Sequence, residues 1–264
     1  MKKLKLLAYT LSLAGMLAAA PVLAAKPAGA GKIGPGLGMD VSYPQCGKSL
    51  PTTPAFAVVG VNGGVANNFN RCFSSELTWA EGASGGTQQP KVSVYVNTGN
   101  PGDVLAQYNL ADWPTSTNPA DPYGSCMGVW TDDLACSWEY GYERAQGDVG
   151  YAGSGARRWW LDVETSNSWT IDAAKNRAAL EGMVYGLTEA GGTVGLYSTA
   201  GAWSSVAGAV PMASPLYALP EWRPGAETQR QAQSNCSLSP LTGGGHITLT
   251  QYTTTLDYDY SCIN

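Results

Sequence analysis

The feature that most constrains the fold is an alternation of short apolar runs with turn-rich or amphipathic stretches. Eight runs have the length and composition of β-strands, and they are residues 38–42, 56–62, 92–97, 159–164, 194–198, 215–219, 247–252 and 255–258. Helices are expected between them at residues 74–83, 138–146 and 171–190. This order indicates parallel strands joined by crossover helices, and eight strands close a barrel. The sequence therefore predicts the α/β class and a single (β/α) TIM-type barrel whose last strands are irregular.

An open, doubly wound sheet is the alternative architecture. Its nucleotide-binding form needs a glycine-rich fingerprint after the first strand, followed by an acidic residue at the end of the next strand. The segment Gly60-Val61-Asn62-Gly63-Gly64 lacks the third glycine and that acidic residue. We interpret it instead as a tight turn leaving the second strand. Residues 100–136 have no clear period and are expected to form a loop insertion.

The first 24 residues have the order of a signal peptide, with three lysines, an apolar run and small residues before the cleavage point. Residues 25–36 form a Gly/Pro/Ala-rich linker, which leaves residues 37–264 for the barrel domain. We therefore expect a secreted, monomeric protein with no membrane segment after cleavage. The formal charge of −5 becomes −8 when the lysines at positions 2, 3 and 5 are removed. Such a charge argues against a nucleic-acid partner.

Six cysteines remain in the exported part, an even number that predicts three disulfides. Their order along the chain suggests pairing Cys46 with Cys72, Cys126 with Cys136, and Cys236 with Cys262, among fifteen possible pairings. The second pair would pin the loop insertion. A zinc site would need closely spaced ligands, yet no two cysteines have that spacing and the single histidine, His246, lies in a Gly-rich turn predicted as a surface loop. No metal and no cofactor are expected.

The segment Trp159-Trp160-Leu161-Asp162-Val163-Glu164 carries the most informative chemistry. Alternate side chains of a strand point to opposite faces, so Trp160, Asp162 and Glu164 share one face and the apolar set shares the other. Two carboxylates would then project toward the barrel axis near the carboxyl end of a strand, where barrel enzymes place catalytic groups. The carboxyl group in the drier position should have its pKa raised. We expect that group to be Glu164.

Further acids occur at other predicted strand ends, where they would converge on the same cleft. They are Asp40 in the first strand and Asp257 with Asp259 in the last. A lone strand-end aspartate can equally be a helix cap or a turn former. The aromatic residues Tyr95, Tyr197, Trp222 and Tyr252 can be core residues or platforms on which sugar rings stack.

At these motifs the chain resembles the family 25 glycoside hydrolases, the lysozyme-type muramidases. The resemblance covers almost the whole exported chain in the order of its strand motifs, and it is carried by Met39-Asp40-Val41-Ser42, Phe56-Ala57-Val58-Val59-Gly60-Val61, Tyr95-Val96-Asn97, Leu161-Asp162-Val163-Glu164, Gly195-Leu196-Tyr197-Ser198, Leu216-Tyr217-Ala218, Thr250-Gln251-Tyr252 and Leu256-Asp257-Tyr258-Asp259. More closely, its Asp-Val-Ser-Tyr-Pro-Gln-Cys start and its Trp-Trp-Leu-Asp-Val-Glu strand look like a divergent group of secreted bacterial proteins related to that family.

The resemblance implies roles for individual residues. Glu164 would protonate the glycosidic oxygen, with Asp162, Asp40 and Asp257 as the other catalytic carboxylates, and Asp259 would replace Asp257 if the register slips by two. The substrate-binding residues would be Tyr95, Asn97, Tyr197, Trp222, Gln251 and Tyr252. The third strand departs from the family because it lacks the usual histidine. A chitinase-type barrel fits less well, because its motif needs acids where Arg157 and Trp160 stand.

The leading hypothesis is therefore a secreted glycoside hydrolase that cleaves a β-linked, peptidoglycan-like amino-sugar polymer, with Glu164 as general acid. The alternative is a non-catalytic secreted barrel that binds a glycan or a protein partner, because fold does not fix function and an acidic surface does not favour approach to an anionic wall. A secreted peptidase or lipase lacks support, since the single histidine has no identifiable nucleophile partner.

Overall fold

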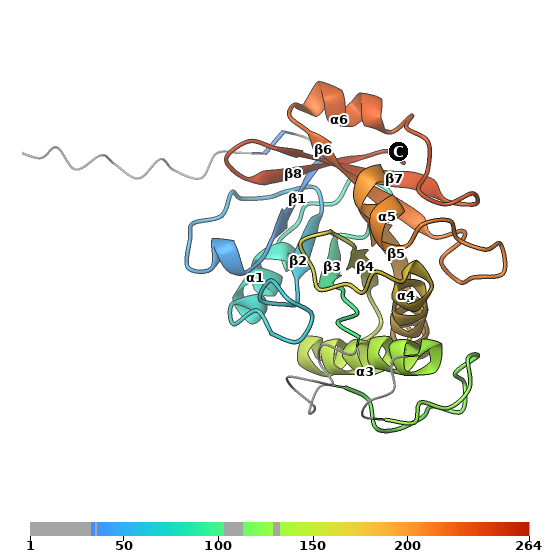
Figure 1. The fold of residues 1–264 in the computed structure, drawn as a ribbon. Coiled ribbons are helices and arrows are strands. Elements are labelled where there is room, and N and C mark those ends of the chain that lie inside the picture. The colour runs from blue at the N-terminus through green and yellow to red at the C-terminus, as the bar shows by residue number, and fades with distance from the viewer. Residues whose placement is uncertain (1–32, 35, 103–112, 129–132, 264) are drawn as a thin grey trace, which may run out of the picture.

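The computed structural model describes residues 33–34, 36–102, 113–128 and 133–263, and the predicted signal peptide and most of the linker lie outside them. The described residues form a closed barrel (Figure 1). Its strands are β1 (Leu37–Val41), β2 (Ala57–Gly60), β3 (Val92–Asn97), β4 (Arg158–Asp162), β5 (Thr193–Tyr197), β6 (Pro220–Ala226), β7 (His246–Thr253) and β8 (Asp257–Ser261). The predicted TIM-type barrel is confirmed, and the open doubly wound sheet is excluded because β8 pairs with β1.

The strands are neighbours in chain order, and β1 to β7 run parallel. β8 runs antiparallel to both β7 and β1, which is the expected irregularity of the last strands. Only residues 254–256 separate β7 from β8. A parallel connection needs a crossover of a dozen or more residues, so a link this short can form only a hairpin.

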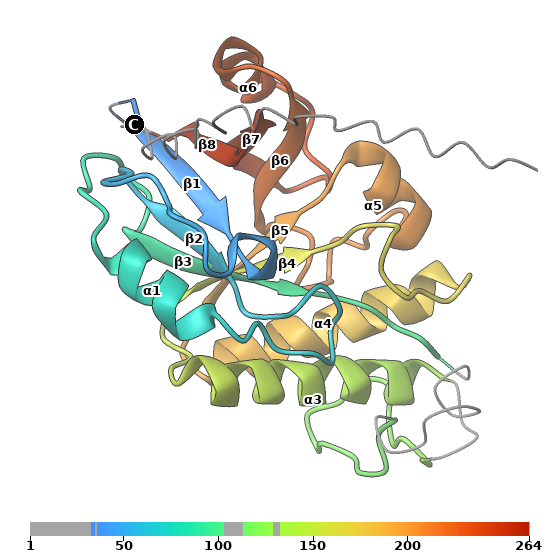
Figure 2. The ribbon, with the colours of Figure 1, turned by 90° about the vertical axis from the view of Figure 1, so that its left-hand side faces the viewer.

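Helices cover the outside of the barrel (Figures 1 and 2). They are α1 (Phe73–Glu81), α3 (Leu134–Ala152), α4 (Ala173–Glu189), α5 (Ala200–Val206) and α6 (Gln229–Asn235), with a 3-10 turn, η1 (Tyr43–Gln45), after β1. The helices predicted at residues 74–83 and 171–190 are confirmed. The one predicted at residues 138–146 is much longer, because it begins at an Asp133 cap that accepts from the backbone N–H of Cys136 and ends at Gly153 in the left-handed region.

Helices α3 and α4 lie side by side in Figure 2 and approach each other closely. Glycines make this approach possible. A Cβ atom at Gly141 would overlap the carbonyl oxygen of Ala179, and one at Gly182 would overlap that of Trp138. Gly141, one of the glycines that weaken the helical signal of α3 in the sequence, is therefore required by its packing against α4.

The strand predicted at residues 215–219 is wrong. That segment is a turn in which Leu216 is fully buried, and the sixth strand follows it as β6. The apolar residues of the turn gave a strand-like pattern, whereas β6 carries two buried charges, Glu221 and Arg223. Their side chains form an ion pair of 3.5 Å between Nη1 and Oε2, which allows the strand to bury them.

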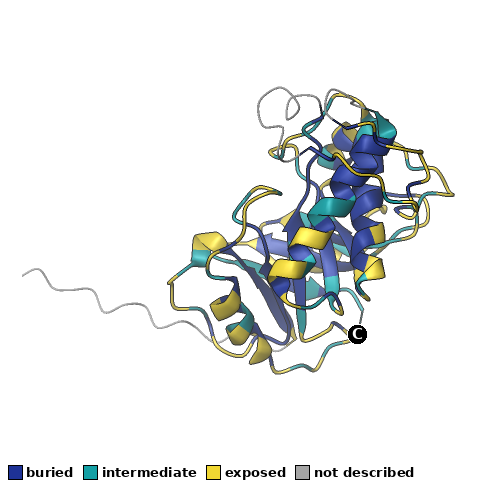
Figure 3. Ribbon diagram, turned by 90° about the horizontal axis from the view of Figure 1, so that it is seen from below, coloured by how far each residue is buried: buried dark blue, intermediate teal, exposed yellow. Residues whose placement is uncertain are grey.

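Two apolar layers follow from the alternation of the strands, and Figure 3 shows burial concentrated on the strands and on the helix faces turned toward them. Outward-facing residues such as Trp159, Leu161 and Val163 pack against the helices. Inside the barrel, Trp160 packs with Trp222 and with neighbours from β2 and β7. A Cβ atom at Gly195 would overlap the ring of Trp160, so a glycine on β5 makes room for that indole.

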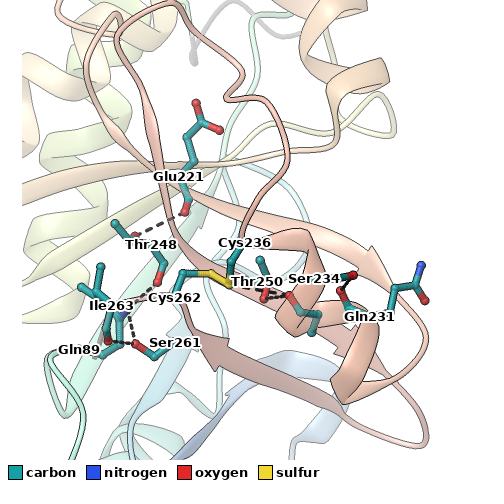
Figure 4. Close-up of a disulfide and its surroundings, with 11 residues drawn as sticks. Gln89, Glu221, Gln231, Ser234, Cys236, Thr248, Thr250, Ser261, Cys262 and Ile263 are labelled. Atoms are coloured by element: carbon teal, nitrogen blue, oxygen red, sulfur yellow. Dashed lines mark hydrogen bonds between the residues drawn. A yellow bond between two sulfur atoms is a disulfide. The ribbon is translucent and has the colours of Figure 1, made fainter.

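The three predicted disulfides are confirmed with the predicted pairing. Cys46–Cys72 joins the η1 turn to the start of α1, and Cys126–Cys136 pins the insertion to α3. Figure 4 shows how the third, Cys236–Cys262, links the end of α6 to the residue after β8. Instead of lying in a surface loop, His246 is the exposed first residue of β7. None of the described helices has the length and apolarity needed to span a membrane.

Candidate active site

Strand β4 delivers two acids to the inside of the barrel. Asp162 is its last residue, Glu164 lies two residues further on, and the apolar residues between and before them face the helices. Asp162 is 5% exposed, whereas Glu164 is only partly buried. The prediction that Glu164 occupies the drier position is therefore wrong. Asp162 is enclosed because its neighbours in the sheet, Asn97 of β3 and Tyr197 of β5, flank it on both sides.

The carboxyl group of Asp162 has one hydrogen-bond partner. Its Oδ2 atom accepts from Nδ2 of Asn97 at 2.7 Å, and its Oδ1 atom is buried without a partner. Burial raises the pKa of Asp162 well above its ordinary value, and the charges of Glu164 and Asp40 raise it further. Asn97, a predicted substrate-binding residue, holds this carboxyl group. It also lines a cavity of about 380 Å³ at the carboxyl ends of the strands.

Asp40 faces the same interior from β1. Its Oδ2 atom accepts from Nε2 of Gln251 at 2.8 Å, and Oε1 of Gln251 accepts in turn from the Tyr197 hydroxyl at 2.9 Å. Burial, and next the charge of Asp257, raises the pKa of Asp40 to about 8. Asp40 lies directly opposite Asp257 in the antiparallel register of β1 and β8, which explains the mutual repulsion.

Both aspartates of β8 point into the barrel, because they are two residues apart. Asp257 lines a cavity of about 240 Å³ at this end of the barrel, and its carboxylate accepts from the Thr253 hydroxyl at 2.7 Å. Asp259 lies beneath it, fully buried, and neither of its carboxyl oxygens has a hydrogen-bond partner of good geometry. Burial, and then the charges of Asp40 and Asp257, raises the pKa of Asp259 well above its ordinary value, although the nearby indole of Trp222 partly offsets this. The structure brings Asp257, and not Asp259, to the cavity.

Three of the four aromatic residues singled out in the sequence line this cavity, namely Tyr95, Tyr197 and Trp222. The ring of Trp222 stands edge-on to that of Tyr197, with 4.5 Å between centroids. Burial, and then the charge of Asp40, raises the pKa of both tyrosines well above the ordinary value, so both remain hydroxyl donors.

Tyr252 is a correction to the predicted substrate-binding set. It neighbours Gln251 on β7, so it points to the opposite face of the strand. There it stacks on Tyr258 of β8, with 5.3 Å between ring centroids, and packs in the cluster beneath α6. It does not reach the cavity.

Two adjoining cavities open above these acids and share Asp40, Tyr95 and Asp257 in their walls. The smaller, of about 240 Å³, also exposes Gln251, Tyr197 and Trp222. The larger, of about 380 Å³, exposes Glu164 and Asn97 together with residues that sequence reasoning missed, which are Ser42, Tyr43, Pro44, Gln45, Gly64, Ser166 and Asn167. Each missed residue follows the carboxyl end of β1, β2 or β4, and that position was the available signal.

The electrostatics of the cavities are one-sided. Among the described residues, no lysine, arginine or histidine lines either of them, so Asp40, Glu164 and Asp257 share a cavity wall without a counter-charge, and Asp162 lies enclosed below them. Burial raises the pKa of Asp40 and of Asp162 above the ordinary value, so these two aspartates retain their protons where other carboxylic acids lose them. Within the described residues, no group of three or more potential ligands has the arrangement needed to hold a metal ion.

Comparisons with known proteins agree with this architecture. A family model described as Lysozyme-like protein 1 matches residues 143–229, about a third of the chain. No curated protein sequence matches the chain. Among solved structures, a muramidase from Acremonium alcalophilum is 16% identical with a TM-score of 0.51, over 85% of this chain and 92% of that one.

Two further structures are similar to the same extent. The bacterial lysozyme from Streptomyces coelicolor is 16% identical with a TM-score of 0.51, over 85% of this chain and 91% of that one. The modular Cpl-1 endolysin, solved in complex with a peptidoglycan analogue, is 15% identical with a TM-score of 0.53, over 86% of this chain and 54% of that one. The chain therefore has a lysozyme-like muramidase fold of the family 25 type.

Proposed function

We propose that this protein is a secreted glycoside hydrolase that cleaves a β-linked amino-sugar polymer of the peptidoglycan type. The observation that carries the proposal is that Glu164 lines the same cavity as Asp40 and Asp257. Asp162, two residues earlier in the chain, lies buried below it. A fold shared with muramidases, one of them solved with a peptidoglycan analogue, supports the choice of substrate class.

Glu164 is the proposed general acid. Burial, and then the charge of Glu164, raises the pKa of Asp162 well above its ordinary value, so Asp162 retains its proton and adds no negative charge beside Glu164. Because Asp162 is enclosed, Glu164 is the member of the pair that can reach a glycosidic oxygen in the cavity. Proton donation to that oxygen begins the cleavage of the glycosidic bond.

The remaining carboxyl groups act on the sugar ring in this proposal. As the bond breaks, positive charge develops at the anomeric carbon, and the nearby carboxyl group of Asp257 stabilises it, whereas Asp40, with its pKa raised to about 8, is a neutral polar group in the same wall. Asp162, enclosed below the cavity, holds Asn97 in the cavity wall through its hydrogen bond. Tyr95, Tyr197 and Trp222 supply the aromatic wall against which a sugar ring can pack.

The test uses the exported chain and insoluble peptidoglycan, with release of reducing ends and mass spectrometry of the products. Glu164→Gln should lower the rate by about 10²–10⁴-fold, the usual contribution of a general acid. Glu227→Gln is the matched control, because Glu227 is exposed and lines neither cavity, and it should cleave at the parent rate. Circular dichroism establishes that both variants fold.

Two results would contradict the proposal. One is a folded Glu164→Gln variant that cleaves as fast as the parent. The other is a parent protein that is retained on peptidoglycan but releases no reducing ends between about pH 4 and pH 7, where carboxylic acids serve as general acids. The second result would identify the non-catalytic, glycan-binding barrel.

A further inference from the structure

The end of the barrel opposite the two acidic cavities holds a separate cavity of about 480 Å³, which we call the base cavity. It lies at the amino ends of β3, β4 and β5, and its wall includes Val92, Ser154, Arg157, Arg158 and Thr193. None of the described aspartates and glutamates lines it. The base cavity is thus the electrostatic opposite of the carboxylate site, in a chain whose formal charge is −5.

Arg158 extends partly buried into this end of the barrel. Its Nε atom donates to the Thr193 hydroxyl oxygen at 2.9 Å, and its guanidinium carbon lies 5.5 Å from the centre of the Trp160 ring. Burial lowers the pKa of Arg158, because nothing nearby compensates the loss of water around its charge. A hydroxyl and an aromatic face orient this guanidinium, but neither neutralises it.

Arg157 is the second cation of the base cavity. Its Nε atom is buried and has no hydrogen-bond partner among the described residues, so nothing at that atom offsets the loss of water around the charge. The ion pair found within the described part of the chain joins Arg223 to Glu221, so neither Arg157 nor Arg158 has a carboxylate partner there.

Two hydroxyl groups complete the set of donors. The oxygen of Ser154 accepts from the backbone N–H of Ala156 at 3.3 Å, and that of Thr193 accepts from Arg158. Because each oxygen is already accepting, its own proton is available to donate elsewhere. Both residues line the cavity.

We propose that the base cavity binds a phosphate-type oxyanion through Arg157, Arg158, Ser154 and Thr193. Guanidinium groups match the geometry of such anions, and two cations with two hydroxyl donors suit a tetrahedral group of several acceptor oxygens better than a single carboxylate. The ligand is either free phosphate or a phosphodiester of an anionic polymer. A polymer bound here would be held at the end of the barrel away from the acidic cavities, where repulsion is weakest.

Isothermal titration calorimetry of the exported chain with sodium phosphate at low ionic strength tests the proposal. We expect saturable binding of one phosphate per chain, weakened by about tenfold or more in Arg157→Gln, as loss of a charged hydrogen-bond donor implies. Arg230→Gln, which removes an exposed arginine on α6, is the matched control and should bind like the parent. Ser154→Ala, a change that removes one hydroxyl only, should weaken binding by a few-fold.

Separate titrations distinguish the source of the phosphate. Tighter binding of a poly(glycerol phosphate) chain than of sodium phosphate would identify a phosphodiester, and the reverse order would identify free phosphate. The proposal is overturned if phosphate shows no saturable binding, if Arg157→Gln and Ser154→Ala both bind like Arg230→Gln, or if sodium acetate binds as tightly as phosphate.

Discussion

The buried Asp40 should make the protein less stable as the pH rises, and the substitution Asp40→Asn should remove part of this loss. In the folded protein the pKa of Asp40 rises from 3.8 to about 8, first through burial and then through Asp257. Between these two values the folded state holds a proton that the unfolded chain has released. Stability is therefore fully present below about pH 4, falls as the pH rises, and falls no further above about pH 8.

The size of the effect follows from the same two values. Each pH unit within the window costs about 1.4 kcal/mol for one proton, so Asp40 contributes at most about 4 kcal/mol of lost stability between pH 5 and pH 8.5. Asp257 shares the repulsion, and about 2–4 kcal/mol is the expected range. In Asp40→Asn the amide carries no charge at either pH, and its oxygen can still accept from Gln251.

The assay is urea unfolding followed by tryptophan fluorescence at pH 5 and pH 8.5, with the disulfides intact. The other buried acids contribute to the fall in both proteins, so the difference between parent and variant isolates Asp40. Glu227→Gln serves as the control for loss of one surface charge and should fall as the parent does. If Asp40→Asn loses as much stability as the parent between the two pH values, Asp40 is not protonated in the folded state and the argument fails.

Two further predictions concern packing and the site. Gly182→Ala on α4 should lower the free energy of unfolding by about 1–3 kcal/mol, because the added Cβ overlaps the carbonyl oxygen of Trp138. Gly150→Ala on α3 faces open space and should be neutral or mildly stabilising. Equal effects of the two substitutions would refute the close approach of α3 and α4. Tyr197→Phe should slow peptidoglycan cleavage, because the Tyr197 hydroxyl donates to Gln251, which in turn donates to Asp40. Tyr252→Phe should cleave at the parent rate, because Tyr252 faces α6. A slower Tyr252→Phe enzyme would show that this orientation is wrong.

Much of the barrel could be predicted because its strands carry a local signal. β3 was located correctly from residue to residue, and the inward face of β4 followed from alternation alone. β6 could not be found in this way. Its buried Glu221 and Arg223 look like surface residues in a sequence. Besides their ion pair, they are satisfied by segments distant in the chain, because Glu221 accepts from the backbone N–H of Leu241 and Arg223 donates to the carbonyl oxygens of Ser198 and Ser239. Similarly, the full length of α3 is hidden by its glycines, of which Gly141 permits the close contact with α4.

The sequence did not correctly predict how deeply each acid lies in the barrel, since Asp162 and not Glu164 is the more buried of the pair. The direction of each strand explains the error. Residues two apart on a strand share a face but differ in depth by about 6.6 Å. β4 runs toward the cavities, so the later acid, Glu164, lies at the opening and Asp162 lies below it. β8 runs the opposite way, so the earlier acid, Asp257, lies at the opening and Asp259 lies below it.

The three-residue link between β7 and β8 already implied the reversal of β8, since so short a connection makes a hairpin. Combined with the rule that barrel sites lie at the carboxyl ends of the parallel strands, it would have placed Asp257 at the opening without any coordinates. The same rule applied to β4 would have assigned the deeper position to Asp162. What the sequence cannot supply is the uncompensated charge. Among the described residues no cation lines the cavities beside Asp40 and Asp257, and this depends on which side chains the six other connections bring to the cavity wall. Burial without a counter-charge raises the pKa of Asp40 to about 8 and that of Asp162 well above its ordinary value, which leaves Glu164 as the acid that opens into the larger cavity beside them.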